Sequence, residues 1–364
     1  MLAAPAASDP QLAPALLAVE DLTVAFPAEG RGASLDASPI PVVDGVSFSV
    51  RRGECVGLVG ESGSGKTMTA LALLQLVPPP GRIVGGRVLL AGEDLLALPE
   101  PAMRRVRGGR IGLVFQEPAS ALDPVYTIGF QIAEAIRAHR DLSWRAARRE
   151  AEALLARVAM PDPRRRLDDY PHQLSGGQRQ RAMLAVALAA GPELLIADEP
   201  TTALDVTLQA AVLALLAELR RELGLAVLLI THDLGVVAEA CDRAVVMYAG
   251  EVVEEAPVGA LFSAPAHPYT RALLAALPRR AAAASGRRPL AVIPGQPPEP
   301  GERPPGCAFA PRCPEVFARC AAERPRSYVV GSLPGDDGAA GSERSARCFL
   351  VAPGTASPVA EARP

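Results

Sequence analysis

The sequence lacks any uninterrupted apolar run long enough to cross a membrane. A membrane-spanning helix needs about 18 or more such residues, and the longest candidates, residues 182–190 and 225–230, suit buried core elements instead. Residues 1–14 also lack the basic region of a signal peptide, and residues 1–16 are expected to form a flexible tail. We therefore expect a protein that is cytosolic or attached to a membrane from its cytosolic side.

The chain also lacks a strong net charge. Its formal charge is −3 over 364 residues, and 49% of these are hydrophobic, which fits a globular protein of one large or two modest domains. Such a balance argues against nucleic acid as the main partner. Arginines do cluster at residues 104–110, 145–149 and 164–166, but solvated helix and loop faces explain these clusters better than a DNA-binding surface does.

Lysine is nearly absent, and asparagine is absent altogether. Of the 37 Lys and Arg residues, only Lys66 is a lysine. Arginine can replace lysine on a surface, but its bulky planar fork cannot replace a compact ammonium inside a tight phosphate-binding loop. The one surviving lysine therefore points to such a loop.

Hydrophobic periodicity predicts an α/β core with a mostly parallel sheet, because strands alternate with helices. Residues 27–41 are rich in Gly, Ser and Pro and are expected to form a loop, while residues 124–169 have the pattern of a helical insertion. From Pro278 onward the chain is rich in Pro, Gly and Ala, which is typical of a small accessory domain with flexible linkers. Strands are predicted at residues 17–26, 45–50, 55–59, 87–90, 110–115, 194–197, 226–230 and 243–247, and helices at 68–76, 178–190 and 206–223.

Residues 60–67 match the phosphate-binding pattern G-x-x-x-x-G-K-[ST], between an apolar strand and a helix-compatible segment. Glycines let the backbone wrap closely around phosphate, and the following helix N-terminus offers unpaired N–H groups. Lys66 is expected to reach the β- and γ-phosphates of a nucleotide, and the Thr67 hydroxyl to bind Mg²⁺. The predicted nucleotide-binding residues of this loop are Gly60, Glu61, Ser62, Gly63, Ser64, Gly65, Lys66 and Thr67.

An acidic pair lies downstream, where the apolar strand at residues 194–197 leads into Asp198 and Glu199. Asp198 is placed to hold Mg²⁺ through water, because Mg²⁺ keeps several of its waters in proteins. Glu199 is placed to polarise the attacking water as a general base. The pair is weak evidence alone, but after a phosphate-binding loop it predicts a nucleotide hydrolase.

Residues 174–178 read Leu-Ser-Gly-Gly-Gln, which resembles the signature of ABC ATPases. The resemblance covers roughly residues 17–262 and implies a P-loop NTPase fold with an antiparallel β subdomain and a helical subdomain at about 124–175. It matches Gln116 to the Q-loop glutamine that senses Mg²⁺ and the membrane partner, residues 203–205 to the D-loop, and His232 to the switch histidine that contacts the γ-phosphate. Phe26 is similar in position to the aromatic residue that stacks on adenine, although an aromatic residue that ends a strand is as often part of the core.

The resemblance also implies how the site is completed. Two subunits would face head to tail, so that the signature of one completes the phosphate-binding loop of the other. Ser175 and Gly177 would donate hydrogen bonds to the γ-phosphate, aided by the dipole of their helix. ATP would close this dimer, and hydrolysis would reopen it. The nucleotide contacts implied outside the phosphate-binding loop are Ser175, Gly176, Gly177, Gln178 and Asp205.

Two short segments narrow the resemblance further. Residues 267–274 (HPYTRALL) and 306–314 (GCAFAPRCP) are similar to the region that follows the ATPase core in oligopeptide, dipeptide and nickel importers. Residues 118–124, after Gln116 and within the core, are also similar to this subfamily. This implies a C-terminal domain at residues 263–350 and a flexible tail at 351–364. The chain has one nucleotide module and no long coiled coil, which argues against translation, excision-repair and chromosome-maintenance ABC proteins.

Four of the six cysteines lie in this C-terminal region, namely Cys307, Cys313, Cys320 and Cys348. A reducing cytosol disfavours structural disulfides, so clustered cysteines there more often bind metal, and the spacing lacks the C-x-x-C pairs typical of zinc. Four thiolates suit an iron–sulfur cluster, and the resemblance implies the [4Fe–4S] centre that some members of the subfamily carry. The alternative is a set of buried or free thiols. Cys55 and Cys241 are expected to be small core residues.

The resemblance predicts the ATP-hydrolysing subunit of a peptide importer, bound peripherally at the cytoplasmic face of the inner membrane with ATP and Mg²⁺ as cofactors. Its expected partners are two transmembrane permease subunits, a second ATPase subunit of a different chain, and an extracytoplasmic solute-binding protein. The Q-loop and the helical insertion would form the groove for the permease. Two alternatives stay open: an importer of nickel or another small solute, and a soluble ABC ATPase that regulates a cytosolic complex.

Overall fold

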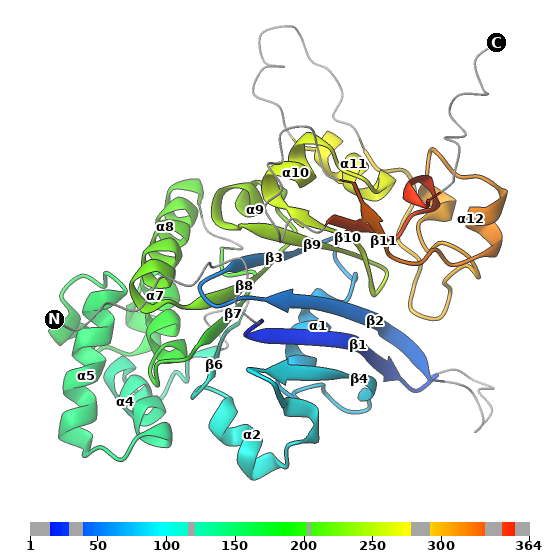
Figure 1. Ribbon diagram of the computed structural model, residues 1–364. Helices are drawn as coiled ribbons and strands as arrows, with labels where there is room; N and C mark the ends of the chain where they lie inside the picture. Colours follow the sequence, from blue (N-terminus) through cyan, green and yellow to red (C-terminus); the bar gives the residue numbers. More distant parts are fainter. Residues whose placement is uncertain are drawn as a thin grey trace, which may run out of the picture.

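The computed structural model describes residues 15–28, 39–115, 121–201, 205–277, 292–331 and 344–353. These residues form two β-sheets surrounded by helices (Figure 1). The smaller sheet is antiparallel, with strand order β2-β1-β4-β5. Its strands are β1 (Leu17–Phe26), β2 (Ile40–Val50), β4 (Arg82–Leu90) and β5 (Glu93–Asp94).

The larger sheet is mixed, with strand order β11-β12-β10-β9-β3-β8-β7-β6. The run from β9 to β6 is parallel, whereas β10, β12 and β11 pair antiparallel at the other edge. Every residue of β3, β7, β8 and β9 is buried, as expected for parallel strands covered on both faces. The strands are β3 (Cys55–Val59), β6 (Ile111–Val114), β7 (Leu194–Asp198), β8 (Ala226–Thr231), β9 (Arg243–Tyr248), β10 (Glu251–Pro257), β11 (Tyr328–Val330) and β12 (Arg344–Ala346).

Helices surround the two sheets (Figure 1). Helix α1 (Lys66–Leu73) contacts strands of both sheets, and the core between the sheets includes Leu58, Leu73 and Ile230. The helices between β6 and α7 form the helical insertion, and others follow β8. The remaining helices are α2 (Glu100–Val106), α4 (Ile128–His139), α5 (Trp144–Arg157), α6 (Pro163–Arg166), α7 (Gly176–Ala187), α8 (Val206–Leu223), α9 (Leu234–Ala240), α10 (Val258–Ser263), α11 (Pro268–Ala275) and α12 (Ala318–Ala322).

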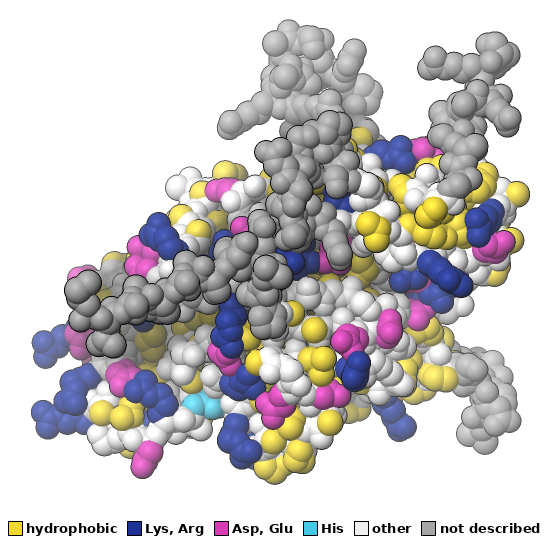
Figure 2. Space-filling view, viewed as in Figure 1, with side chains coloured by type: hydrophobic (Ala, Val, Ile, Leu, Met, Phe, Trp, Pro, Cys, Tyr) yellow, Lys and Arg dark blue, Asp and Glu magenta, His cyan; other side chains and the backbone are white. Residues whose placement is uncertain are grey.

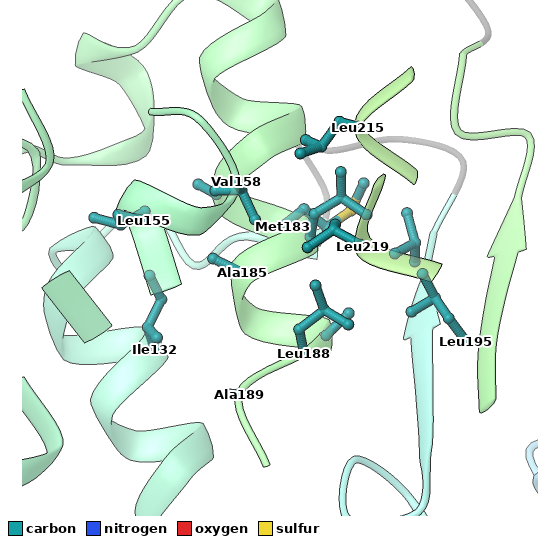
Figure 3. Close-up of a cluster of buried hydrophobic side chains, with 14 of the residues drawn as sticks. Ile132, Leu155, Val158, Met183, Ala185, Leu188, Ala189, Leu195, Leu215 and Leu219 are labelled. Atoms are coloured by element: carbon teal, nitrogen blue, oxygen red, sulfur yellow. The ribbon is translucent and has the colours of Figure 1, made fainter. Parts of the chain in front are cut away.

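The helical insertion has a continuous apolar core with the main sheet. Figure 3 shows Ile132 of α4, Leu155 of α5, Met183 of α7 and Leu219 of α8 in the same buried cluster as Leu195 of β7. The predicted insertion is thus helical, and α7 joins it to the nucleotide-binding core. On the face shown in Figure 2, basic and acidic side chains are interspersed and do not gather into a patch of one sign. Among the described residues, no helix is both long and apolar enough to span a bilayer.

The C-terminal region is continuous with the main sheet. Strand β12 pairs with β10, with Glu254 opposite Ala346, and β11 pairs with β12. The sequence analysis predicted neither strand, because strands of three residues carry almost no periodicity. Several element ends also differ from the predictions. Strand β2 begins at Ile40, inside the expected loop, and β4 begins at Arg82 instead of residue 87. Helix α1 covers Lys66–Leu73 instead of residues 68–76, and α7 covers Gly176–Ala187 instead of residues 178–190.

Candidate nucleotide-binding site

The phosphate-binding loop connects β3 to α1, at the carboxyl edge of the parallel strands. Strand β8 lies beside β3 and β7 beside β8, all parallel, so the residues that follow these three strands meet at one edge. Asp198 ends β7, Glu199 comes next, and His232 directly follows β8. The fold therefore brings together the loop, the acidic pair and the histidine that the sequence analysis singled out.

The Lys66 side chain is folded onto its own loop. Its Nζ donates hydrogen bonds to the carbonyl oxygens of Gly60 at 2.8 Å and Glu61 at 3.0 Å, and the residue is 6% exposed. Burial lowers the pKa of Lys66, and the carboxylates of Glu199, Asp198 and Glu61 oppose that shift. A buried ammonium with acceptors at loop carbonyls is set to receive a compact anion.

Glycines make the loop possible. A Cβ at Gly60 would lie 2.2 Å from the carbonyl oxygen of Met247, so no side chain fits there. Gly65 has a φ of 98° and Gly63 a φ of 80°, both in the left-handed region that glycine adopts without strain. Ser64 is buried, and its hydroxyl has no hydrogen-bond partner among the described residues. Such a group inside a polar loop is available to a ligand.

Asp198 fits a cation site. The residue is 6% exposed, and its Oδ1 has no hydrogen-bond partner among the described residues. Burial raises the pKa of Asp198, while a hydrogen bond from the Thr67 side chain and the charge of Lys66 lower it. A buried carboxylate oxygen beside a threonine hydroxyl is the donor set that Mg²⁺ prefers.

Glu199 and His232 form a pair next to this carboxylate. The Glu199 Oε1 and the His232 Nδ1 are 3.0 Å apart, and the Glu199 side chain is 15% exposed against 57% for His232. Glu199 has a φ of 46°, in the region that residues other than glycine rarely adopt, while its N–H donates to the Ile230 carbonyl at 2.9 Å. Strain of this kind is stored where a side chain must point in a required direction.

The Leu-Ser-Gly-Gly-Gln segment begins α7. Ser175 is the N-cap, and its Oγ accepts from the Gln178 N–H at 3.4 Å while the Gln178 Oε1 accepts from the Ser175 N–H at 3.0 Å. The two glycines differ in their surroundings. A Cβ at Gly177 would lie 2.6 Å from the Leu208 side chain, whereas a Cβ at Gly176 would meet nothing within 4 Å.

Asp205, Phe26 and Gln116 are the other residues predicted to contact the nucleotide or its Mg²⁺. Asp205 is the N-cap of α8, and its Oδ1 accepts from the Leu208 N–H at 2.9 Å. Phe26 packs against the core between the sheets and against Gly81, where a Cβ would lie 2.5 Å from the phenyl ring. Its stacking on adenine stays a prediction. Gln116 lies outside the described residues, as do residues 118–120 of the predicted subfamily segment and residues 203 and 204 of the D-loop.

Two solved structures of similar shape come from ABC transporters. The dimeric bacterial ABC transporter cassette MJ0796 matches with a TM-score of 0.57 and 28% identity, over 66% of this chain and 98% of that one. The protein cbiO1 from Clostridium perfringens, part of the ABC transporter complex cbiONQ, matches with a TM-score of 0.58 and 25% identity, over 69% and 91%. The predicted ABC ATPase fold is thereby confirmed.

Sequence relatives decide the family. The family described as "ABC transporter" matches residues 43–202, and "Oligopeptide/dipeptide transporter, C-terminal region" matches residues 253–320. A Brucella abortus (strain 2308) protein named for peptide import ATP-binding is 50% identical over 316 residues, 87% of this chain and 92% of that protein. The dipeptide transport ATP-binding protein DppD of Escherichia coli (strain K12) is 49% identical over 311 residues, 85% and 92%. This chain belongs to the ABC transporter ATP-binding subunits.

In this ABC ATPase the second residue of the phosphate-binding loop faces the C-terminal region. The Glu61 carboxylate accepts two hydrogen bonds from Arg312, and the Glu61 N–H donates to the Tyr269 hydroxyl. Arg312 and Tyr269 stand in the two short segments that carried the subfamily resemblance, but the sequence analysis gave neither a role. A sequence contains no sign of which of its charges a given arginine will meet, so this contact could not be predicted.

The four C-terminal cysteines of this ABC ATPase line one cavity, together with His267 and Phe349 among others. Burial raises the pKa of Cys307 and Cys313, and raises the pKa of Cys348 to about 12, so these thiols stay protonated at neutral pH. Among the described residues, no group of three or more Cys, His, Asp or Glu side chains is arranged to hold a metal ion. The thiols share a cavity, but as they are oriented they do not form a ligand set.

Proposed function

We propose that this chain hydrolyses ATP to drive the import of peptides across the cytoplasmic membrane. The proposal rests on one observation above all, which is that an ABC nucleotide site and an oligopeptide/dipeptide transporter C-terminal region occur in the same chain. The Brucella abortus and Escherichia coli relatives, named for peptide import and dipeptide transport, span both regions and support the choice of peptides.

Binding of ATP would use the phosphate-binding loop. Lys66 would exchange its two carbonyl acceptors for phosphate oxygens, and the backbone of residues 60–67 together with the α1 N-terminus would surround the phosphates. Thr67 and Asp198 would hold Mg²⁺, which offsets negative charge on the phosphates. The unpartnered Asp198 Oδ1 supports this role. Phe26 would lie near the base.

Hydrolysis would depend on Glu199. Its carboxylate would accept a proton from the attacking water, and His232 would orient the carboxylate through the 3.0 Å contact before turning to the γ-phosphate. Gln116 would orient the same water and sense the permease. The strained backbone of Glu199 supports a catalytic role, because it fixes the direction of the side chain.

A second ATPase subunit would complete the site. The α7 N-terminus carries Ser175 and the open position at Gly176, where a phosphate held by another subunit could approach the N–H groups. Gly177 and Gln178 would face the same phosphate, and Asp205 would lie beside it at the start of α8. We propose a different ATPase chain as the second subunit.

The subunit would bind peripherally to the cytoplasmic face of the membrane. Two permease subunits would be its membrane partners, docked on a groove formed by the Q-loop and the helical insertion. In that insertion Tyr126, Phe130 and Trp144 form a stacked, partly exposed aromatic row. An extracytoplasmic binding protein would deliver the peptide.

We keep the proposed division into an ATPase domain at residues 17–262 and a C-terminal domain at 263–350, although β11 and β12 extend the main sheet.

Co-purification tests this assignment. The tagged full chain, extracted from its native membrane in mild detergent, should bring down a pair of integral membrane proteins and a second ATPase. ATP hydrolysis by that complex should rise when a peptide-loaded binding protein is added. Stimulation by nickel instead would favour the alternative cargo, and a soluble partner with no membrane protein would favour a regulatory ATPase.

We also propose that Cys307, Cys313, Cys320 and Cys348 bind an iron–sulfur cluster. Their common cavity supports this, but the thiols would have to lose their protons and turn toward one another. Protein purified without oxygen should contain close to four iron and four sulfide per chain, the count set by a [4Fe–4S] centre. Colourless, iron-free protein would leave buried thiols as the correct interpretation.

A further inference from the structure

We propose that the C-terminal region positions the phosphate-binding loop by holding Glu61, so that Arg312 and Tyr269 are positioning residues for nucleotide binding. The inference rests on the proposed nucleotide site and adds a second role to the region that follows the ATPase core. We call the three residues Glu61, Tyr269 and Arg312 the Glu61 clasp.

The side chain of Glu61 is held by a two-pronged ion pair. Arg312 Nη1 lies 2.7 Å from Glu61 Oε2, and Arg312 Nη2 lies 3.1 Å from Glu61 Oε1. The Arg312 side chain is 5% exposed and that of Glu61 is 26% exposed, so water screens the pair only in part. A planar guanidinium that meets both carboxylate oxygens fixes orientation as well as distance. Lysine at this position could not do the same.

The backbone of Glu61 is held from the same side. Its N–H donates to the Tyr269 hydroxyl at 2.9 Å, and Tyr269 is fully buried at the start of α11. The centroid of the Tyr269 ring lies 4.7 Å from that of the Tyr248 ring and 5.3 Å from that of the Phe309 ring. Tyr248 ends β9, the strand beside β3. Tyr269 is therefore anchored to the same sheet that carries the phosphate-binding loop.

The clasped segment is the one that Lys66 binds. The carbonyl oxygens of Gly60 and Glu61 accept the hydrogen bonds of the Lys66 ammonium. A shift of Glu61 would move both acceptors and with them the ammonium that must meet the phosphates. Misplacement by a fraction of an ångström is costly in a site that works by fixed geometry.

Charge gives the clasp a second effect. Glu61 places a carboxylate in a loop that must receive a polyanion, and Asp198 and Glu199 already lie close to Lys66. Arg312 offsets the charge of Glu61 through its ion pair with the carboxylate. Without Arg312, the uncompensated carboxylate would repel phosphate across a poorly screened distance.

Arg312 also connects the loop to the cysteine cavity. It ends the single turn η4 (Ala310–Arg312), and both Ala310 and the next residue, Cys313, line the cavity. The Arg312 Nε donates to the Pro294 carbonyl at 2.9 Å, which holds the guanidinium from the C-terminal side. The position of the phosphate-binding loop therefore depends on how this region is folded.

A double-mutant cycle in the full-length chain tests the clasp, with affinity for a fluorescent ATP analogue and Mg²⁺ as the readout. Arg312→Gln should raise the dissociation constant about tenfold, as expected when a buried charge loses its partner. Adding Glu61→Gln should bring the constant back to within about threefold of wild type, because the repelling charge is then gone. Tyr269→Phe keeps the ring and should weaken binding about threefold.

Arg271→Gln is the matched control, since Arg271 pairs with Glu315 at 2.8 Å in the same region without touching the loop. It should leave affinity unchanged at a comparable shift in melting temperature. Wild-type affinity in both Arg312→Gln and Tyr269→Phe would overturn the clasp while leaving the ATPase assignment intact. Failure of the wild-type chain to bind ATP would refute the proposed function itself. If Arg312→Gln does not fold, Tyr269→Phe decides the question alone.

Discussion

At the scale of single residues, the site depends on charges placed where burial opposes them. Lys66 and Asp198 are each 6% exposed. Burial lowers the pKa of Lys66 and raises that of Asp198, so in both cases it favours the neutral form. Each is kept usable by its neighbours, Lys66 by three carboxylates and Asp198 by Thr67 and Lys66. Such opposed shifts are typical of sites that await a charged ligand.

Lys66→Arg should fold and yet lose ATP affinity by about tenfold or more, because the forked guanidinium cannot occupy a pocket shaped by two loop carbonyls. Binding of a fluorescent ATP analogue with Mg²⁺ measures this. Arg104→Lys is the converse control, since the Arg104 side chain is 77% exposed and its replacement should change nothing. Wild-type affinity in Lys66→Arg would contradict the explanation given for the only lysine of the chain.

Residues with local signatures could be predicted from the sequence, and their partners could not. The spacing of residues 60–67 and the acidic pair at the end of β7 identified the nucleotide site, because phosphate binding needs such residues close together in the chain. Glu61 and Arg312 are separated by 251 positions, and only folding brings them together. Pairs of this kind follow from the topology of the sheet.

At the scale of elements, α7 presents a helix N-terminus with one glycine packed and one open. Gly177 lies against the Leu208 side chain, which would have to shift if Gly177 carried a Cβ. Gly176 has free space around it within its own subunit. The open space at Gly176 is where another subunit's phosphate is proposed to lie.

Gly176→Glu should therefore leave the melting temperature close to wild type, since a carboxylate in the first turn suits the helix dipole. It should still lower ATP hydrolysis by about tenfold or more, because the carboxylate would face the partner's phosphate. Calorimetry and a phosphate-release assay on the assembled complex measure the two effects. Gly177→Ala is the matched variant and should lose stability as well. Full hydrolysis by Gly176→Glu would exclude a phosphate at this position.

Helix α11 adds a pH dependence through its N-cap. The His267 Nδ1 accepts from the Tyr269 N–H at 3.0 Å, so the ring must be neutral at that atom. Burial, and then the charge of Arg271, lower the pKa of His267 from 6.5 to about 3. Between these values the unfolded chain binds a proton that the folded chain refuses. The contribution of the neutral His267 to stability is therefore complete above about pH 6.5 and is lost as the pH falls toward 3.

His267→Asn keeps a side-chain cap and removes this titration. Its free energy of unfolding should change less steeply than that of wild type between pH 6.5 and about 4, the difference in slope being at most about 1.4 kcal/mol per pH unit. Denaturant unfolding at several pH values measures it. Burial raises the pKa of the nearby Glu254, which acts in the opposite direction but equally in both proteins. Parallel pH profiles would show that His267 is not buried as a neutral ring.

Element types were predicted better than element ends. Parallel strands such as β3 and β8 are continuous apolar runs and were identified from them. The first residues of β2 were predicted to be part of a loop because Ile40 lies between two prolines, Pro39 and Pro41. In the structure Ile40 pairs with Phe26 of β1. Pairing with the neighbouring strand sets where β2 begins, and the hydrophobic pattern of one strand alone does not contain that information.

At the scale of the whole molecule, the C-terminal region contacts the phosphate-binding loop and both sheets. Besides the Glu61 clasp, Arg303 and Arg324 both bind Asp44 of β2, at 3.0 Å and 2.6 Å, and Arg324 also pairs with Glu251 of β10. These contacts connect the C-terminal region to both the antiparallel sheet and the main sheet. In an importer built this way, the C-terminal region that is typical of the subfamily would contact the loop that binds ATP.

The most direct test of the account is ATP hydrolysis by the Glu199→Gln variant in the assembled complex. The substitution keeps the shape of the side chain and removes the base, so ATP should bind with near wild-type affinity while turnover falls about a hundredfold or more. Bound ATP should accumulate unhydrolysed. Turnover at the wild-type rate in this variant would contradict the catalytic assignment and the proposed ATPase mechanism with it.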